Sequence, residues 1–153
     1  MKNHFLLFLA VCFYLHVNAQ IAHPVKFTYS SKRIGENEAI IYINAHIEDG
    51  WQIYSLNMEE GGPIKTSIVF ESSNDYQLVG NTTESDPVVK YDDRFRMTIG
   101  YFKREAKFAQ KVKFGKGKVK VEGRIEYMVN NDRICLPPER IKFSHIIEDL
   151  PSN

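Results

Sequence analysis

Hydrophobic and polar residues alternate along most of this chain, a pattern typical of β-strands that bury one face. The clearest run covers residues 39–47, where Ile41, Ile43, Ala45 and Ile47 fall on one side. No segment shows the three-and-four-residue spacing that indicates an amphipathic helix. The pattern predicts strands at 25–30, 39–47, 51–54, 66–70, 76–79, 94–102, 107–114, 118–129 and 141–145.

Turn residues separate these strands at intervals of about 8–12 residues, the spacing of an antiparallel β-sandwich. Gly115-Lys116-Gly117 predicts a hairpin between the strands on either side, because glycine accepts the positive φ angles of tight turns. Two longer connections, 57–65 and 81–93, are expected to be loops. Residues 20–153 contain no repeat or linker and are therefore expected to form a single all-β domain.

The first 19 residues have the order of features that signal peptidase recognises. A polar stretch with Lys2 precedes an apolar run, and the small residues Val17 and Ala19 end the segment. The apolar run is shorter than the roughly 20 residues that span a bilayer. We expect residues 1–19 to be a cleaved signal peptide that leaves no membrane span; a retained N-terminal anchor is the alternative.

Size and charge narrow the class of protein further. Removing 19 residues from 153 leaves 134, about the size of one ordinary domain. The chain carries 20 Lys and Arg against 19 Asp and Glu, so its charge gives no general attraction to nucleic acid or membranes. A hydrophobic content of 43% supports a packed core. We expect a monomer without a nucleic-acid partner.

Several kinds of chemistry lack the residues that they need. His23, His46 and His145 are far apart in the sequence and do not have the spacing of metal ligands. No nucleophile elbow is present, and the glycines around Lys116 do not have the spacing of a phosphate-binding loop. We therefore expect neither a metal nor a cofactor.

Cys135 is the only cysteine outside the predicted signal peptide, because Cys12 lies within it. Exported proteins occupy an environment in which disulfides form. A single cysteine cannot form a disulfide within the chain, so Cys135 is either buried and inert or reactive toward another protein.

The residues around Cys135 predict a rigid loop at one end of the sandwich. They read Tyr127-Met128-Val129-Asn130-Asn131-Asp132-Arg133-Ile134-Cys135-Leu136-Pro137-Pro138 and follow a long strand. Asn and Asp bond to nearby backbone and tolerate left-handed conformations, so Asn130 is expected to be a turn residue. The two prolines fix φ and lack a donor, which stiffens the backbone after the cysteine.

This segment resembles the active-site loop of the N-terminal periplasmic domain of DsbD-type thiol:disulfide interchange proteins. In members from Bacteroidetes that loop typically reads Tyr-Met-Val-Cys-Asn-Asp-x-x-Cys-Leu-Pro-Pro. The resemblance extends over residues 50–55, 60–67 and 75–80. It implies an immunoglobulin-like β-sandwich, a periplasmic location and descent from a protein-disulfide reductase.

One departure from the family pattern changes the expected chemistry. The family uses two cysteines that cycle between dithiol and disulfide as electrons pass from a membrane partner to periplasmic proteins. Here Cys135 matches the second cysteine, and Asn130 stands in place of the first. Because a second thiol normally resolves a mixed disulfide, the resemblance implies impaired or single-cysteine redox activity.

The resemblance also implies which residues contact a thioredoxin-like or other exported partner. Within the matched segment these are Tyr127, Asp132, Arg133, Leu136 and Pro137.

In the family a separate loop caps the thiols until a partner docks. This implies a cap here around residues 86–91, with Asp86 and Tyr91 as further contacts. Two alternatives stay open: a non-catalytic binding or assembly module with an inert Cys135, and a dimer linked through Cys135.

Overall fold

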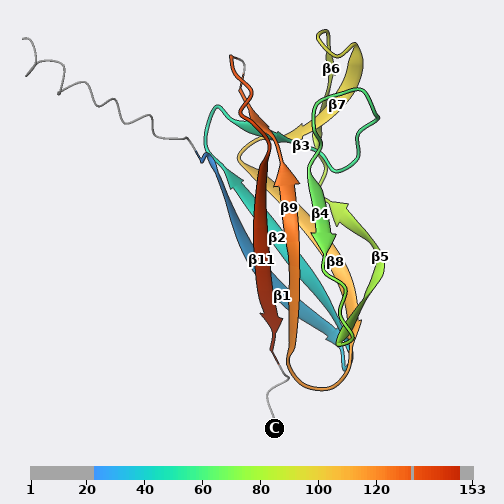
Figure 1. The fold of residues 1–153 in the computed structure, drawn as a ribbon. Helices are drawn as coiled ribbons and strands as arrows, with labels where there is room; N and C mark the ends of the chain where they lie inside the picture. Colours follow the sequence, from blue (N-terminus) through green and yellow to red (C-terminus); the bar gives the residue numbers. More distant parts are fainter. Residues whose placement is uncertain (1–22, 132, 149–153) are drawn as a thin grey trace, which may run out of the picture.

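The computed structural model describes residues 23–131 and 133–148, which form strands, turns and loops without a helix (Figure 1). The described range therefore contains no helix that could cross a membrane. The predicted signal peptide lies outside it. The strands are β1 (Val25–Gly35), β2 (Glu38–Ile47), β3 (Gln52–Tyr54), β4 (Ser67–Phe70), β5 (Tyr76–Glu84), β6 (Val88–Asp92), β7 (Met97–Phe102), β8 (Glu105–Phe114), β9 (Val119–Tyr127), β10 (Val129–Asn130) and β11 (Glu139–Ile147).

Two antiparallel sheets pack against each other and form the body of the fold (Figure 1). One has the strand order β1-β2-β8-β5, and the other has the order β11-β9-β4. A further sheet, with the order β10-β3-β7-β6, lies at one end of the body, and we call it the end sheet. The architecture is an immunoglobulin-like antiparallel β-sandwich, which confirms the predicted fold class.

The core lies between the two sheets of the body because each strand turns its apolar face inward. In β2 every second residue is buried, and β8 and β9 show the same alternation. The largest buried side chains of these strands are Ile41, Ile43, Phe108, Val112, Val121 and Ile125. The alternation that predicted the strands therefore also marks the core.

The end sheet forms because long strands break at corners and change their partners. Between β2 and β3 the chain turns at Gly50, whose φ is 85°. Between β7 and β8 it turns at Arg104, whose φ is 65° and whose carbonyl accepts a hydrogen bond from the Ile47 amide at 2.8 Å. A positive φ is uncommon outside glycine, so the packing around Arg104 holds this corner in place.

The structure corrects the hairpin predicted at Gly115-Lys116-Gly117. The strands on either side, β8 and β9, belong to different sheets and do not pair. The connection therefore crosses from one sheet of the sandwich to the other. Glycine is needed for the positive φ of 89° at Gly117, but that requirement does not distinguish a hairpin from a crossing turn.

The prediction of a loop over residues 81–93 is also wrong. Strand β5 continues to Glu84, and β6 pairs with β7 as a hairpin. The strand predicted at 94–102 begins only at Met97. Strand β6 escaped detection because it is an exposed edge strand, in which Val88 and Val89 are adjacent and do not alternate with polar residues.

Gly123 occupies a position in β9 that has no room for a side chain. A Cβ atom there would lie 2.6 Å from the Phe143 ring and 2.6 Å from the Val69 carbonyl oxygen. The carbonyl cannot move without disturbing the pairing of β4 with β9. We expect Gly123→Ala to lower the free energy of unfolding by about 2–3 kcal/mol, measured by urea denaturation.

Gly115→Ala is the matched control, because a Cβ atom at Gly115 meets nothing within 4 Å. Its free energy of unfolding is expected to stay within about 0.5 kcal/mol of the wild-type value. Equal urea midpoints for the two variants would contradict the packing described for β9.

Candidate functional site

Cys135 is held against β10 by backbone pairing. It forms an antiparallel bridge with Asn130. The amide of Asn131 donates to the carbonyl of Ile134, and the amide of Leu136 donates to the carbonyl of Val129, both at 2.9 Å. These two bonds flank the bridge, so residues 130 and 135 form a non-hydrogen-bonded pair, whose Cα atoms are typically about 4.5 Å apart.

A tight turn joins the two halves of this pair. The side-chain oxygen of Asn131 accepts hydrogen bonds from the amides of Arg133 and Ile134, at 2.9 and 2.8 Å. This is the turn chemistry expected of asparagine. The turn and the two following prolines fix the backbone on both sides of Cys135, as the sequence predicted.

Register places four polar or sulfur-bearing side chains on one face of the end sheet. Asn130 lies opposite Cys135 on one side and opposite Gln52 of β3 on the other. Residues opposite each other point to the same face, and so do residues two apart in a strand. Cys135, Asn130, Gln52 and Tyr54 therefore share a face, which we call the site face.

The other face of the end sheet joins the main core. Ile53, Val129 and Phe102 are buried there with the residues of the body. On the site face, Tyr54 packs with Ile99 and Tyr101 in a smaller apolar cluster, and the three methionines of the described chain, Met58, Met97 and Met128, pack around it. The site face is thus anchored from behind by the core and alongside by this cluster.

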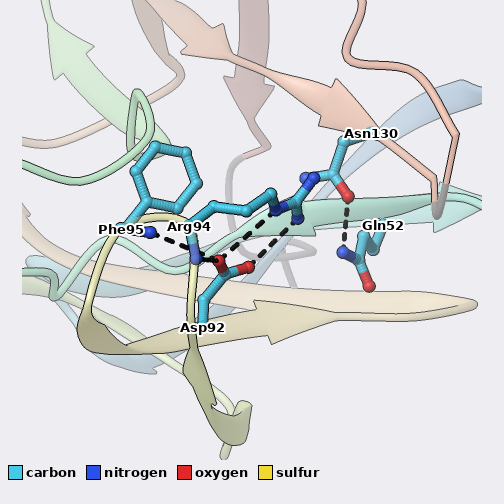
Figure 2. Close-up of polar contacts among 5 residues, drawn as sticks. All are labelled: Gln52, Asp92, Arg94, Phe95 and Asn130. Carbon is cyan, nitrogen blue, oxygen red and sulfur yellow. Dashed lines mark hydrogen bonds and ion pairs between the residues drawn. The ribbon is translucent and has the colours of Figure 1, made fainter.

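Asn130 is a buried strand residue, which corrects the expectation that it belongs to the turn. Its exposed fraction is 1%. Its side-chain oxygen accepts a hydrogen bond from Nε2 of Gln52 (Figure 2). Its Nδ2 group has no hydrogen-bond partner within the described residues. The turn begins one residue later because the pairing of β10 with β3 requires Asn130 in the sheet.

Tyr54 lies beside Asn130 and is completely buried. Its hydroxyl also has no hydrogen-bond partner of normal geometry among the described residues. Burial, helped by the charge of Cys135, raises the pKa of the Tyr54 hydroxyl to about 12, although Arg94 and the Asn130 amide act to lower it. Tyr54 is therefore a neutral hydrogen-bond donor throughout the physiological range of pH.

The tip of the β6–β7 hairpin brings charged groups to the site face. Arg94 forms an ion pair with Asp92 at 3.0 Å, and Asp92 also accepts the backbone amides of Arg94 and Phe95 (Figure 2). Figure 2 shows the Arg94 guanidinium reaching from this tip toward the Asn130 amide. The charge of Arg94 acts on both Tyr54 and Cys135, so the hairpin tip contributes a cation to the site.

Cys135 itself is exposed, at the edge of the end sheet. The alternative in which this cysteine is packed under its loop is therefore wrong. Ile134 beside it is 51% exposed, and Arg133 and Pro137 are exposed as well. Leu136 is half-buried and packs against the core. Asp132 lies outside the described residues.

The structure contradicts a direct role for Tyr127 in contacting a partner. Tyr127 is 2% exposed, and its ring packs edge-on against Phe27 with 5.1 Å between centroids. Its hydroxyl donates to Glu139 at 3.0 Å. The residue is a core tyrosine because it lies on the inward face of β9, the period-2 position next to Ile125.

The cap predicted at residues 86–91 is also corrected. Asp86 lies in the connection before β6. Tyr91 pairs with Thr98, and these side chains point to the opposite face of the hairpin from those of the neighbouring pair, Asp92 and Met97. The segment that reaches the site is the hairpin tip, residues 92–95. Local sequence patterns do not predict this position of the tip, because locating it requires knowing that β6 is a strand.

Gln52, Tyr54 and Arg94 are site residues that the sequence did not predict to act there. Gln52 and Tyr54 are two apart in a predicted strand, so a common face could have been inferred. They lie close to Asn130 only because β3 pairs with β10, and no local sequence pattern predicts that pairing. The described part of the chain contains no group of three or more His, Cys, Asp or Glu that could hold a metal ion.

Comparison with solved structures identifies the fold around this site. The reduced N-terminal domain of DsbD from Neisseria meningitidis matches with a TM-score of 0.54 at 16% identity, over 80% of this chain and 86% of that chain. The fold is similar to that of the DsbD N-terminal domain. No protein-family model matches the chain, and no curated protein matches its sequence.

Two further structures have the same DsbD-like fold. The N-terminal periplasmic domain of ScsB from Proteus mirabilis matches with a TM-score of 0.57 at 14% identity, over 86% of this chain and 50% of that chain. The DsbD N-terminal domain in complex with the PilB N-terminal domain, from Neisseria meningitidis, matches with a TM-score of 0.51 at 17% identity, over 77% and 80%. At these identities the likeness establishes the fold alone.

The pairing of residues 130 and 135 predicts that Asn130→Cys forms a disulfide with Cys135. Non-hydrogen-bonded pairs have Cα separations near 4.5 Å, which lies within the roughly 4.4–6.8 Å of protein disulfides. On mild oxidation the variant should lose both free thiols without forming dimers, as measured by thiol titration and a non-reducing gel.

Gln52→Cys is the matched control. Gln52 lies two strands away from Cys135, roughly 10 Å, so no bridge can close without backbone movement. Intramolecular oxidation of the control, or a failure of the Asn130 variant to oxidise, would show that the register around Cys135 is wrong.

The Asp92–Arg94 ion pair predicts a dependence of stability on pH. The hydrogen bond from Arg94 lowers the pKa of Asp92 below its ordinary value of 3.8. A lowered folded-state pKa contributes stability that is present above the ordinary value and lost as the pH falls through the lowered one. Asp92→Asn should cost about 1 kcal/mol or less at neutral pH, and nothing once the carboxyl is protonated.

Urea denaturation of wild type and variant at neutral and at acidic pH measures this difference. Asp93→Asn, at the exposed neighbouring residue, is the control and should leave the midpoint unchanged at both pH values. A difference between wild type and Asp92→Asn that persists in acid would contradict the ion-pair explanation.

Proposed function

We propose that this chain is an exported domain of the thiol:disulfide interchange type that docks another protein through the segment around Cys135. The observation that carries the proposal is an exposed thiol, held rigidly at a sheet edge, directly opposite a buried Asn130. The similarity of the fold to that of the DsbD N-terminal domain supports it.

The docking surface we propose is the exposed stretch around Cys135, made of Arg133, Ile134 and Pro137, with Leu136 beneath it. An exposed apolar side chain next to a reactive sulfur suits a protein partner better than a small charged molecule. In Neisseria meningitidis a DsbD N-terminal domain forms a complex with a PilB N-terminal domain. By analogy, we propose a thioredoxin-like or other exported protein as the partner, and the periplasm as the location.

The chemistry of a single thiol differs from that of a pair. The Cys135 thiolate attacks one sulfur of a partner disulfide; a new S–S bond forms, the old one breaks, and the other partner sulfur leaves as a thiolate. In a two-cysteine site the second thiol would then release the partner. Asn130 cannot do so, and the mixed disulfide lasts until a thiol from another molecule attacks it.

Native-state labelling of the exported, processed protein tests the availability of the thiol. Cys135 should react with N-ethylmaleimide at a rate close to that of the denatured protein, with one equivalent bound per chain. Labelling only after denaturation would contradict the proposal and favour a binding or assembly module with an inert cysteine.

Capture in cells tests the docking. We expect the wild-type protein to form mixed-disulfide complexes that Cys135→Ser abolishes. Asn130→Cys should greatly reduce them, because the added thiol resolves the intermediate. Homodimer as the sole cross-linked species would contradict docking of another protein and support the disulfide-linked dimer.

A further inference from the structure

Two hydrogen-bond donors are buried side by side on the site face, and neither forms a hydrogen bond of normal geometry with a described residue. They are the Tyr54 hydroxyl, in a residue with 0% exposure, and Nδ2 of Asn130, in a residue with 1% exposure. Leaving a buried donor unpaired costs about 1–3 kcal/mol, and such groups are rare in folded proteins. Because both of these donors lie near an exposed cysteine, a different chemical state of that cysteine could supply an acceptor for them.

Each polar group that faces this point can donate a hydrogen bond. Asn130 has already used its oxygen for Gln52, which leaves only its N–H group. Tyr54 stays protonated, as shown by its raised pKa. Arg94 brings a positive charge, and the carboxylate of Asp92 is occupied by Arg94 and two backbone amides. The site therefore presents two donors and a positive charge, and it suits a compact group with negative charge or lone pairs on oxygen.

Cys135 can supply that oxygen itself. Its backbone lies opposite Asn130, so its sulfur and the Asn130 amide project from the same face. Oxidation of the sulfur adds an oxygen atom one bond beyond it, on the face that carries these donors. We propose that Cys135 is oxidised by hydrogen peroxide to a sulfenic acid, and that Tyr54 and Asn130 stabilise this form by donating hydrogen bonds to its oxygen.

The step balances with peroxide as the only oxidant. The Cys135 thiolate attacks one peroxide oxygen; an S–O bond forms, the O–O bond breaks, and hydroxide leaves and takes a proton from solvent to become water. The sulfur loses two electrons and the peroxide gains them. A thiol of another protein can then attack the sulfenic sulfur, forming a mixed disulfide and releasing a second water.

Asn130 explains why the sulfenic acid would last. A cysteine at position 130 would lie within disulfide distance and would condense with the sulfenic acid at once. Asparagine cannot condense in this way, and it adds a donor at the same place. The replacement thus converts a geometry suited to an internal disulfide into one that holds an oxidised single sulfur until an external thiol arrives. This chemistry does not depend on the docking proposal.

The experiment treats the processed protein with hydrogen peroxide and adds dimedone, which alkylates sulfenic acids, after increasing delays. Intact-mass measurement follows the adduct. Wild type should give an adduct that Cys135→Ser lacks. Tyr54→Phe removes only a hydroxyl, and its sulfenic acid should decay roughly tenfold faster, since one hydrogen bond to the sulfenic oxygen is lost.

Two variants test the specificity of this effect. Tyr76→Phe is the matched control, because Tyr76 is a buried tyrosine whose hydroxyl donates to the Glu71 carbonyl at the other end of β8; its decay should equal that of wild type. Asn130→Asp keeps the shape and the acceptor for Gln52 but replaces the donor with a carboxylate oxygen. It should reduce the adduct roughly tenfold or more.

The proposal fails if wild type consumes its thiol without forming a dimedone adduct. It also fails if the sulfenic acid of Tyr54→Phe decays no faster than that of Tyr76→Phe. That result is expected if the side-chain amides of Asn130 and Gln52 have the opposite orientation, so that Tyr54 already donates to the Asn130 oxygen. A protein that forms the adduct but captures no partner in cells would contradict the docking proposal alone.

Discussion

The pairing of Asn130 with Cys135 is the constraint on which the site depends. Two backbone hydrogen bonds, on either side of the pair, fix the distance between these residues and the direction of both side chains. The pairing of β10 with β3 then sets Gln52 and Tyr54 beside them. A shift of one residue would turn Asn130 toward the core and Val129 toward the site face, burying an unpaired amide and losing an apolar contact.

This constraint holds because the face of the end sheet opposite the site face is buried in the core. Ile53, Val129 and Phe102 join the core of the sandwich, so β3, β7 and β10 cannot slip without breaking apolar packing. The corners at Gly50 and Arg104 allow the strands to enter the end sheet from the body. A rigid thiol at the edge is thus a product of the whole sandwich rather than of its loop alone.

The fold class followed from the sequence because alternation in β2, β8 and β9 reports a sandwich core directly. The exposed strand β6 could not be predicted from the sequence, since an edge strand with adjacent valines has no alternation of polar and apolar residues. For the site, Cys135 and the Asn131 turn were predictable from local chemistry. Asn130 was placed in the turn because its residue type favours turns, whereas pairing with β3 draws it into the sheet. Tyr54 and Arg94 come close to Cys135 and Asn130 only through contacts between segments that are distant in the sequence.

One spectroscopic measurement tests the central claim most directly. In a non-hydrogen-bonded antiparallel pair the two Cα atoms approach closely, so their α-protons lie in contact. The nuclear Overhauser spectrum of the reduced protein should show a strong cross-peak between the α-protons of Asn130 and Cys135. A strong cross-peak from Cys135 to Val129 or Asn131 in its place would show a different register, and the account of the site would be wrong.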